Sequence, residues 1–234
     1  EREMTIKTGY IGLGNIGKPM CENLIKNRAD NGLEVYVYDV VAEPISEMVA
    51  LGAIAADSPK VIAQNCDLIG LCVRHDGDVD DLLYGDDGML ANGRKGSIIA
   101  IHSTVTRDNI LRWAKDAAEI GVHIIDAPIT GGAGGAADGT LCIMVGGDET
   151  IIERAAPMFA GTSKKVVHGG ELGSGVVLKL ANNLITYAAM TACSEAIALV
   201  KNAGVEMQRL FDVGEANGVI TPSAQQFING REGL

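Results

Sequence analysis

Three glycines near the amino terminus, Gly12, Gly14 and Gly17, have the spacing G-x-G-x-x-G. An apolar run precedes them and apolar residues at helical spacing follow, so they should form a turn between a strand and a helix. Such glycines permit a tight turn, a close approach of the backbone to a pyrophosphate, and close packing of helix on strand. The N–H groups at the start of the helix then attract phosphate. We therefore expect a dinucleotide phosphate site at Gly12, Gly14, Asn15, Ile16 and Gly17.

An acidic residue, Asp39, follows a second apolar stretch, residues 34–38, which we expect to be a strand. It lies about 20 residues after the glycines, where a carboxylate can accept hydrogen bonds from the adenosine ribose. A carboxylate at this place also repels a 2′-phosphate, so Asp39 favours NAD over NADP. The alternative is an ordinary aspartate that ends a strand and caps the next helix.

Lys179 and Asn183 stand four residues apart in a long apolar stretch, and on a helix they would share one face. A lysine in such surroundings either extends its ammonium group to water or has a lowered pKa. With a lowered pKa it could act as a catalytic acid and base. The composition of the stretch alone favours the lysine that reaches water, and both interpretations stay open here.

A glycine-rich stretch, residues 126–136, contains Thr130, Gly131 and Gly132 between two apolar strands. Successive glycines expose backbone N–H groups, and the threonine hydroxyl stands beside them, which together suit a carboxylate. A flexible linker would have a similar composition. The strands on both sides follow too closely for a linker, so we favour the carboxylate site.

The elements that carry these residues alternate between strand and helix as far as residue 145, which predicts a doubly wound, mostly parallel α/β sheet. Ligands of such sheets bind beyond the carboxyl ends of the strands. That edge would hold the glycine turn, Asp39, Val73-Arg74, Ser103-Thr104 and the stretch from Asp126 onward. From Gly175 to about Ala203 we expect one long helix, buried between layers because it is apolar nearly all round. A further helix over residues 206–215 follows.

Composition limits the class of protein. With 30 acidic and 19 basic side chains the net charge is −11, which disfavours binding to nucleic acid or to an anionic membrane. No run of about 18 apolar residues is expected to cross a bilayer. The five cysteines are odd in number and form no C-x-x-C pair, as in a reduced cytoplasmic protein. No spacing of His, Cys, Asp and Glu indicates a metal site.

Three stretches in this order, GYIGLGNIGKPM, DAPITGGAGGAADGTLCIMVGGD and GSGVVLKLANN, resemble the 3-hydroxyisobutyrate dehydrogenase (β-hydroxyacid dehydrogenase) family, near tartronate semialdehyde reductase. The resemblance implies a Rossmann domain over residues 1–172 and an all-helical domain over residues 173–234. The family pattern continues beyond residue 234, so the helical domain is expected to be incomplete. It also implies a small carboxylate as substrate and, with the apolar helix, a homodimer or homotetramer.

The resemblance assigns roles by motif position. Lys179 would be the catalytic acid and base, with Asn183 as its partner on the substrate. The residues implied for the substrate carboxylate are Thr130, Gly131 and Gly132; those implied for the cofactor path are Val73, Arg74 and Thr104, of which Thr104 could also touch substrate. The sequence departs from the usual pattern at two of these places and at one further position. Thr130 replaces a serine, Arg74 replaces a proline, and His102 stands where Asp or Met is common, which we interpret as a packed histidine.

The implied activity is hydride transfer between NAD and a short-chain 3-hydroxy acid. Two alternatives stay open at the level of sequence. A 6-phosphogluconate-dehydrogenase-type enzyme would use the same lysine but would need basic groups for a phosphate, and none cluster near Thr130. A catalytically silent dinucleotide-binding scaffold would keep the glycine turn without turnover.

Overall fold

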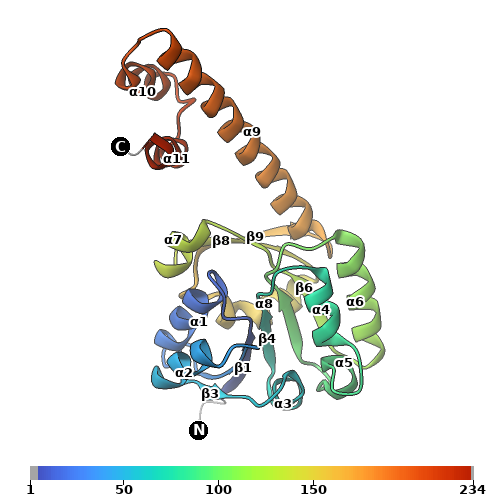
Figure 1. Ribbon diagram of the computed structural model, residues 1–234. Helices are drawn as coiled ribbons and strands as arrows, with labels where there is room; N and C mark the ends of the chain where they lie inside the picture. Colours follow the sequence, from blue (N-terminus) through green and yellow to red (C-terminus); the bar gives the residue numbers. More distant parts are fainter. Residues whose placement is uncertain (1–4, 233–234) are drawn as a thin grey trace. The chain divides into compact units, whose positions relative to one another are not determined.

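The computed structural model describes residues 5–232 (Figure 1). The chain divides into two compact units, one that ends at Lys179 and one that begins at Leu180. This division falls inside a long helix, α9 (Ser174–Asn202), whereas the predicted boundary at residue 172 lies in the turn before it. That boundary stays a prediction.

The first unit is built on one sheet that contains nine strands within residues 5–232. The strand order is β3-β2-β1-β4-β5-β6-β8-β7, and β9 pairs with β8. The strands are β1 (Ile6–Ile11), β2 (Leu33–Tyr38), β3 (Ile54–Ala55), β4 (Leu68–Leu71), β5 (Ile98–Ile101), β6 (His123–Asp126), β7 (Ile129–Thr130), β8 (Leu141–Gly146) and β9 (Ser163–Gly170).

The first six strands are all parallel, which confirms the predicted doubly wound sheet. Their central members are continuous apolar runs because both faces are covered. β4 and β5, for example, contain only buried residues. The strand order reverses direction next to β1, so a crevice is expected at the carboxyl ends of β1 and β4.

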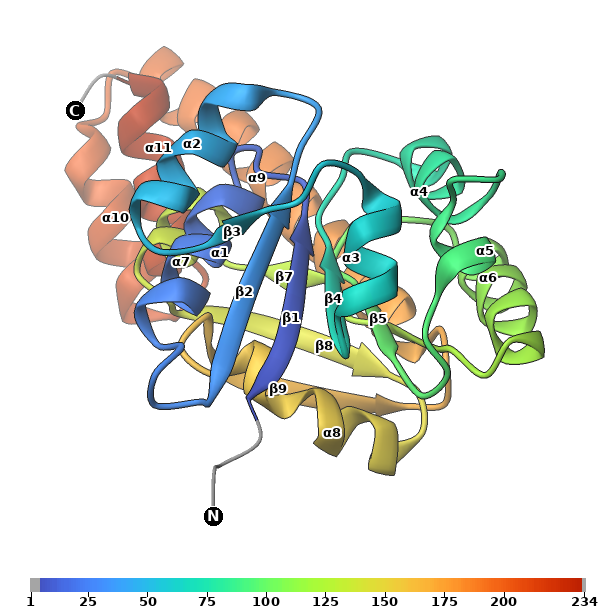
Figure 2. The same cartoon turned by 90° about the horizontal axis from the view of Figure 1, so that it is seen from below.

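Helices cover both faces of this sheet (Figure 2). One face packs on α3 (Pro59–Asn65), α4 (Asp76–Leu83), α5 (Met89–Asn92) and α6 (Arg107–Glu119), with Trp113 fully buried in the shared core. The opposite face packs on α1 (Gly17–Lys26), α2 (Ala42–Ala50) and α8 (Glu149–Phe159). The α1 helix uses Met20, Leu24 and Ile25 for this contact, as their spacing predicted.

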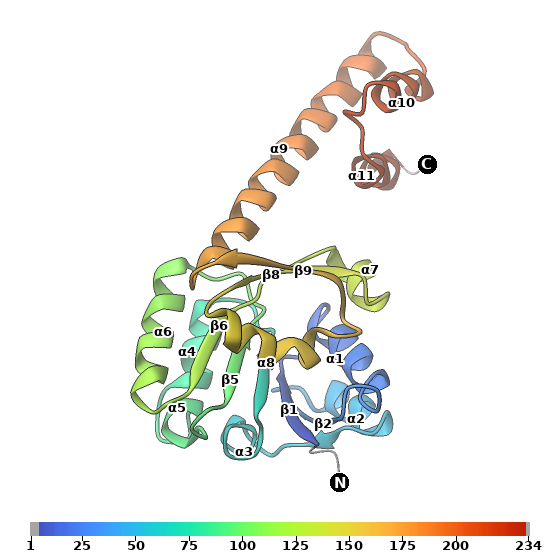
Figure 3. The ribbon, with the colours of Figure 1, turned by 180° about the vertical axis from the view of Figure 1, so that it is seen from behind.

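The glycine-rich stretch after β6 is ordered structure, which excludes the flexible linker. Thr130 pairs with Cys142 across antiparallel strands, and a short helix, α7 (Gly132–Ala137), follows. The Asn23 side-chain amide holds α7 by donating to the carbonyl of Ala136 at 2.7 Å. The sequence did not indicate either element, because β7 is only two residues long and α7 is rich in glycine, which lowers helix propensity. β8 and β9 lie side by side beyond them (Figure 3).

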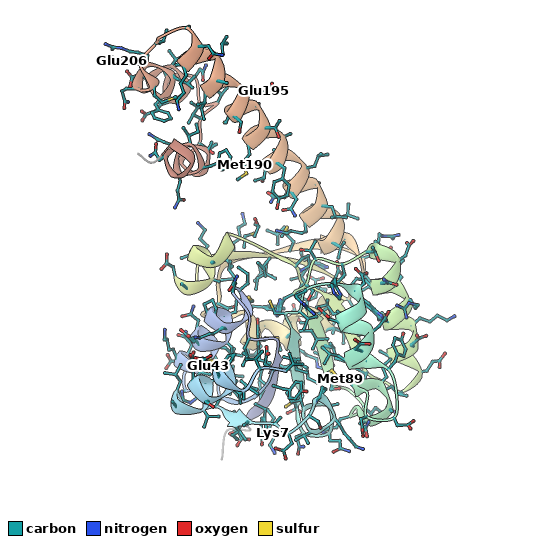
Figure 4. All side chains as sticks on the ribbon, in the orientation of Figure 1. Lys7, Glu43, Met89, Met190, Glu195 and Glu206 are labelled. Atoms are coloured by element: carbon teal, nitrogen blue, oxygen red, sulfur yellow. The ribbon has the colours of Figure 1, made fainter. Side chains whose placement is uncertain are left out.

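The second unit contains the rest of α9, α10 (Met207–Ala216) and α11 (Pro222–Glu232). Ile197, Phe211 and Ile228 form its small core. The predicted long helix is confirmed, but its predicted burial is wrong within residues 5–232. Leu184, Ile185 and Tyr187 are 71%, 72% and 63% exposed. The side chains of α9 project on all sides, with Met190 and Glu195 labelled in Figure 4.

The length and apolar character of α9 also correct a prediction about membranes. Over an 18-residue window its mean hydropathy is 1.3, so among the described residues one helix is long and apolar enough to cross a bilayer. The sequence predicted no such stretch because α9 is not an uninterrupted apolar run and contains scattered polar residues. A helix covered by other protein surface meets the same criteria, so length and composition do not assign α9 to a membrane.

Candidate functional site

The glycine turn between β1 and α1 has the conformation that its spacing predicted. Gly12 has a φ of +95°, and a side chain there would collide with the carbonyl oxygen of Cys72. At Gly17 a side chain would collide with the carbonyl of Gly12, so this glycine permits the close packing of helix and strand. Gly14 is different, because a Cβ there would meet no heavy atom within 4 Å. Gly12 and Gly17 are therefore required by the packing of the chain, whereas Gly14 leaves open space in front of the turn.

The amino terminus of α1 is open to a ligand. Its N-cap residue, Ile16, provides no side-chain hydrogen bond to the helix, and Gly14 and Asn15 are exposed. The first N–H groups of a helix have no partner within the helix, and they carry part of the positive end of its dipole. The residues at this helix start therefore fit a pyrophosphate.

Asp39 follows β2 and is held in place by the same turn. One carboxylate oxygen accepts a hydrogen bond from the Leu13 N–H at 2.6 Å, and the other accepts from the Val41 N–H at 2.8 Å. Asp39 is not the N-cap of α2, which is Val41. The carboxylate is half-buried, and each oxygen keeps a second lone pair that could accept from a ribose hydroxyl.

A cavity of about 570 Å³ connects the glycine turn with Asp39. Its walls come from the ends of β1, β2 and β4 and from α3 and α4, and they include Gly12, Gly14, Asp39, Val40, Val41, Pro59, Val73, Arg74, Asp78, Asp81 and Leu82. Apolar walls beside a fixed carboxylate suit the adenosine half of a dinucleotide, so the residues present fit this cofactor. The cavity lies at the edge where the reversal of strand order predicted a crevice.

The charge along this cavity is mainly negative. Arg74 is exposed, and its guanidinium pairs with Asp78 at 3.2 Å. This arginine holds the pKa of Asp78 below its usual value. Since Asp39 and Asp81 line the same cavity, three carboxylates face one cation. Val73 lies beside them, and its N–H donates to the hydroxyl of Ser103 at 2.9 Å.

The predicted substrate residues of the first unit follow β5 and β6 at the carboxyl ends of these two strands. Thr130 is half-buried in β7, and Gly131 and Gly132 are exposed with φ angles of +128° and +66°. Only glycine adopts such angles at little cost, so the path of this loop requires glycine at both positions. Thr104 is exposed in the turn that follows β5. The first unit thus brings the carboxylate loop and Thr104 to the carboxyl edge of its sheet.

Lys179 lies on α9, at the end of the first unit, and is half-buried. Burial lowers the pKa of its ammonium group from the usual value, as expected for a lysine that transfers protons. Within residues 5–232 its amine has no hydrogen bond or ion pair with another side chain. Asn183 follows one turn later on the same helix and belongs to the second unit. The roles of both residues stay predictions.

Asp126 is a site residue that sequence reasoning did not identify beyond placing it at the sheet edge. It ends β6, is fully buried, and accepts hydrogen bonds from the N–H groups of Gly173 at 2.7 Å and Val176 at 2.8 Å. These groups start α9, so Asp126 caps the helix that carries Lys179. No local pattern reveals this, because the partners lie 47 and 50 residues further along the chain.

His102 is a packed histidine, as predicted. It is 3% exposed, lies between the rings of Tyr10 and Phe159, and donates from Nδ1 to the carbonyl of Ala127 at 2.9 Å. Burial lowers its pKa from 6.5 to about 4, so the ring is neutral at physiological pH. His102 therefore supports the segment between Asp126 and Thr130 and has no direct place in the site.

Comparison with known proteins agrees with this geometry. Residues 7–170 match the family described as the NAD-binding domain of 6-phosphogluconate dehydrogenase. Residues 173–228 match the family described as the NAD-binding domain of NADP-dependent 3-hydroxyisobutyrate dehydrogenase. Together the two matches cover nearly all of the described chain.

Three relatives represent the similarity. The chain is 35% identical to 2-(hydroxymethyl)glutarate dehydrogenase of Eubacterium barkeri, over 92% of this chain and 71% of that protein. It is 35% identical to 2-hydroxy-3-oxopropionate reductase of Escherichia coli, over 88% and 68%. The structure of Mycobacterium tuberculosis 3-hydroxyisobutyrate dehydrogenase with L-serine matches with a TM-score of 0.81 and 31% identity, over 91% of this chain and 71% of that chain. The glycine turn, the half-buried lysine and these matches together show that the chain belongs to the 3-hydroxyisobutyrate dehydrogenase (β-hydroxyacid dehydrogenase) family of NAD-binding oxidoreductases.

Proposed function

We propose that this protein interconverts a 2-substituted 3-hydroxypropanoate and the corresponding aldehyde, with NAD as the cofactor. The observation that carries the proposal is the half-buried Lys179, whose pKa is lowered by burial, on the helix that starts beside the glycine-rich loop. The names of the relatives support the substrate class. Hydroxymethylglutarate, serine and 3-hydroxyisobutyrate all carry a CH₂OH group next to the carbon that bears a carboxylate.

The residues would divide the work as follows. Bound NAD supplies a nicotinamide ring that accepts or returns a hydride. In the oxidation direction the neutral amine of Lys179 accepts the proton of the substrate hydroxyl, and in the reduction direction its ammonium donates one. The Thr130 hydroxyl and the N–H groups of Gly131 and Gly132 hold the carboxylate. The Asn183 amide orients the alcohol oxygen, so that the reacting carbon keeps one position.

A preference for NAD over NADP is part of the proposal. A 2′-phosphate in the cavity would meet Asp39 together with Asp78 and Asp81, and Arg74 in the cavity wall already pairs with Asp78. Repulsion between like charges in a partly closed cavity disfavours that phosphate. Thr104 is proposed to contact cofactor or substrate from the end of β5.

We also propose a homodimer or homotetramer in the cytoplasm. The exposed apolar residues of α9 form a surface of the kind that finds a partner in solution. All five cysteines are free thiols, as in a reducing compartment. The names of the relatives support a small carboxylate as substrate, and the net charge of −11 argues against nucleic acid or an anionic membrane as a partner.

A panel of 3-hydroxy acids with NAD, read by NADH absorbance, tests the proposal. It should include 3-hydroxyisobutyrate, L-serine, glycerate and 6-phosphogluconate, each also measured with NADP. We expect turnover with at least one unphosphorylated acid and NAD. Turnover of 6-phosphogluconate alone would replace the proposed substrate class. NAD binding by calorimetry without turnover of any member would instead indicate the silent dinucleotide-binding scaffold.

A further inference from the structure

The start of α9 is fixed by a single carboxylate from a distant strand. The two oxygens of Asp126 accept from different N–H groups, those of Gly173 and Val176, at 2.7 and 2.8 Å. The helix has 29 residues, and its dipole places partial positive charge at this end. Both the hydrogen bonds and the helix dipole therefore stabilise a negatively charged carboxylate at this end of the helix.

The surroundings of this carboxylate are shaped for it by two glycines. A side chain at Gly146 would collide with one Asp126 oxygen, and a Cβ at Gly175 would come within 2.9 Å of the other. Asp126 is itself completely buried, and desolvation raises the pKa of its carboxyl above the usual value. A buried carboxylate held this closely permits little freedom to the first turn of α9.

Asp126 also lies next to the carboxylate-binding loop along the chain. Ala127 and Pro128 follow it and lead to Thr130, and they are held by backbone bonds from Ala127 N–H to Ile101 O at 2.9 Å and from Met144 N–H to Pro128 O at 2.9 Å. The segment that ends in Thr130 and the helix turn that leads to Lys179 thus meet at one side chain. Lys179 is only three residues beyond Val176, the last N–H that Asp126 binds.

We propose that Asp126 is a positioning residue, which fixes the first turn of α9 against the Thr130 loop and so sets where the Lys179 amine stands relative to the substrate. The inference rests on the proposed role of Lys179. It assigns Asp126 no contact with substrate or cofactor. Its effect is transmitted through the backbone of residues 173–179 alone, all within the first unit.

The decisive variant is Asp126→Asn, which keeps the size of the side chain but replaces one acceptor oxygen by an N–H donor. We expect kcat to fall about 100-fold, the usual cost of a misplacement of about 1 Å, with the NAD dissociation constant within twofold. A looser first turn also exposes Lys179 to water, which raises the pKa of its amine. Because the neutral amine is needed for oxidation, the rise of kcat with pH should move to higher pH.

A second readout needs neither substrate nor cofactor. Acetic anhydride labels neutral amines, so the labelling of Lys179 as a function of pH, measured by peptide mass spectrometry, follows its titration directly. In Asp126→Asn the midpoint should shift to higher pH, whereas the labelling of the exposed Lys164 in the same digest should not change. The labelling measurement tests the role of Asp126 even if no acid of the panel is turned over. Absence of turnover would contradict the proposed function, but it would not decide the positioning role.

The matched control is Asp148→Asn, the same change at the cap of another helix. Asp148 accepts from the N–H groups of Thr150 at 2.9 Å and Ile151 at 3.3 Å at the start of α8, which carries no site residue. It should alter neither kcat nor Lys179 labelling. Equal effects of both variants, or no effect of Asp126→Asn on kcat and labelling, would overturn the proposal.

A milder variant covers the case in which Asp126→Asn does not fold. Asp126→Ser keeps one acceptor oxygen and should shift the labelling midpoint in the same direction. If neither variant folds, as judged by circular dichroism, Asp126 is a residue of the fold and the positioning role is wrong.

Discussion

The helix starts of α1 and α9 differ in what satisfies their first N–H groups. Both begin with N–H groups that have no partner within the helix, and both place the positive end of a helix dipole at the carboxyl edge of the sheet. At α1 no side chain caps the helix, and Gly14 leaves the space in front of it empty. At α9 the Asp126 carboxylate occupies that place completely. We call the start of α1 the open start, because it can receive a phosphate from a ligand. We call the start of α9 the closed start, because Asp126 already fills it and it can only fix the position of side chains further along the helix.

The largest expected effect concerns the side chain that the closed start would hold. Lys179→Ala should lower turnover by roughly two to four orders of magnitude, the usual contribution of a positioned acid and base. It should leave NAD affinity nearly unchanged, because the open start of α1 and Asp39 are untouched. Turnover and calorimetric NAD binding must be measured on the same folded sample.

Lys179→Arg is the control for this variant. It retains the positive charge, but guanidinium does not release its proton at neutral pH, so turnover should not return. If Lys179→Ala keeps turnover within a factor of a few, the lysine is structural and the closed start of α9 holds no catalytic group.

The second prediction concerns the histidine that supports the segment next to the closed start. The pKa of His102 is lowered from 6.5 to about 4, so between these pH values the unfolded chain binds a proton that the folded chain does not. Its contribution to stability is thus complete above pH 6.5 and is lost as the pH falls toward 4. The shift corresponds to about 3 kcal/mol.

His102→Asn isolates this effect, because the amide can still donate to the carbonyl of Ala127 but cannot titrate. Between pH 7 and pH 4, urea unfolding should show that the unsubstituted protein loses about 3 kcal/mol more than the variant. The raised pKa of Asp126 acts in the opposite direction in both proteins and therefore cancels. Parallel pH profiles for the two proteins would contradict the prediction.

The third prediction separates the two kinds of glycine at the open start. Gly14→Ala places a methyl group in the empty space, so NAD affinity should fall about 10- to 100-fold from lost hydrogen bonds to charged phosphate, with unchanged thermal stability. Gly12→Ala should lower stability as well, because its φ of +95° and the carbonyl of Cys72 both oppose a side chain. Calorimetry measures the NAD affinity of both variants, and thermal unfolding measures their stability. A Gly14→Ala protein that binds NAD normally would show that the start of α1 is not a phosphate site.

The smallest expected effect is on cofactor choice at the far end of the same cavity. Asp39→Ala should reduce the preference for NAD over NADP about tenfold, because it removes ribose hydrogen bonds and the repulsion of a 2′-phosphate. Asp39→Asn should lie between, since it removes the charge but keeps one acceptor. The ratio of kcat/KM for the two cofactors measures this. An unsubstituted protein that uses NADP as well as NAD would defeat the claim.

Much of the open start could be predicted from sequence because its parts are neighbours along the chain. Gly12, Gly14 and Gly17 lie within six residues, so spacing alone fixes the strand, the turn and the helix. The same local logic predicted Asp39 at the end of β2 and the length of α9. It failed for α7, because three of its six residues are glycines and its stability comes from Asn23 on α1.

The closed start was decided by tertiary structure alone. Asp126 and Val176 are 50 residues apart, and nothing in either stretch indicates that a carboxylate will cap the helix. Burial is a property of the same kind, since the sequence left Lys179 undecided between water and a site, and only packing determined that its pKa is lowered. For α9 the absence of proline and of internal glycine predicted a helix, but whether its apolar side chains are covered depends on what packs against them. Local propensities and spacings are set by residues next to each other, whereas caps, burial and pKa values are set by groups that only the folded chain brings together.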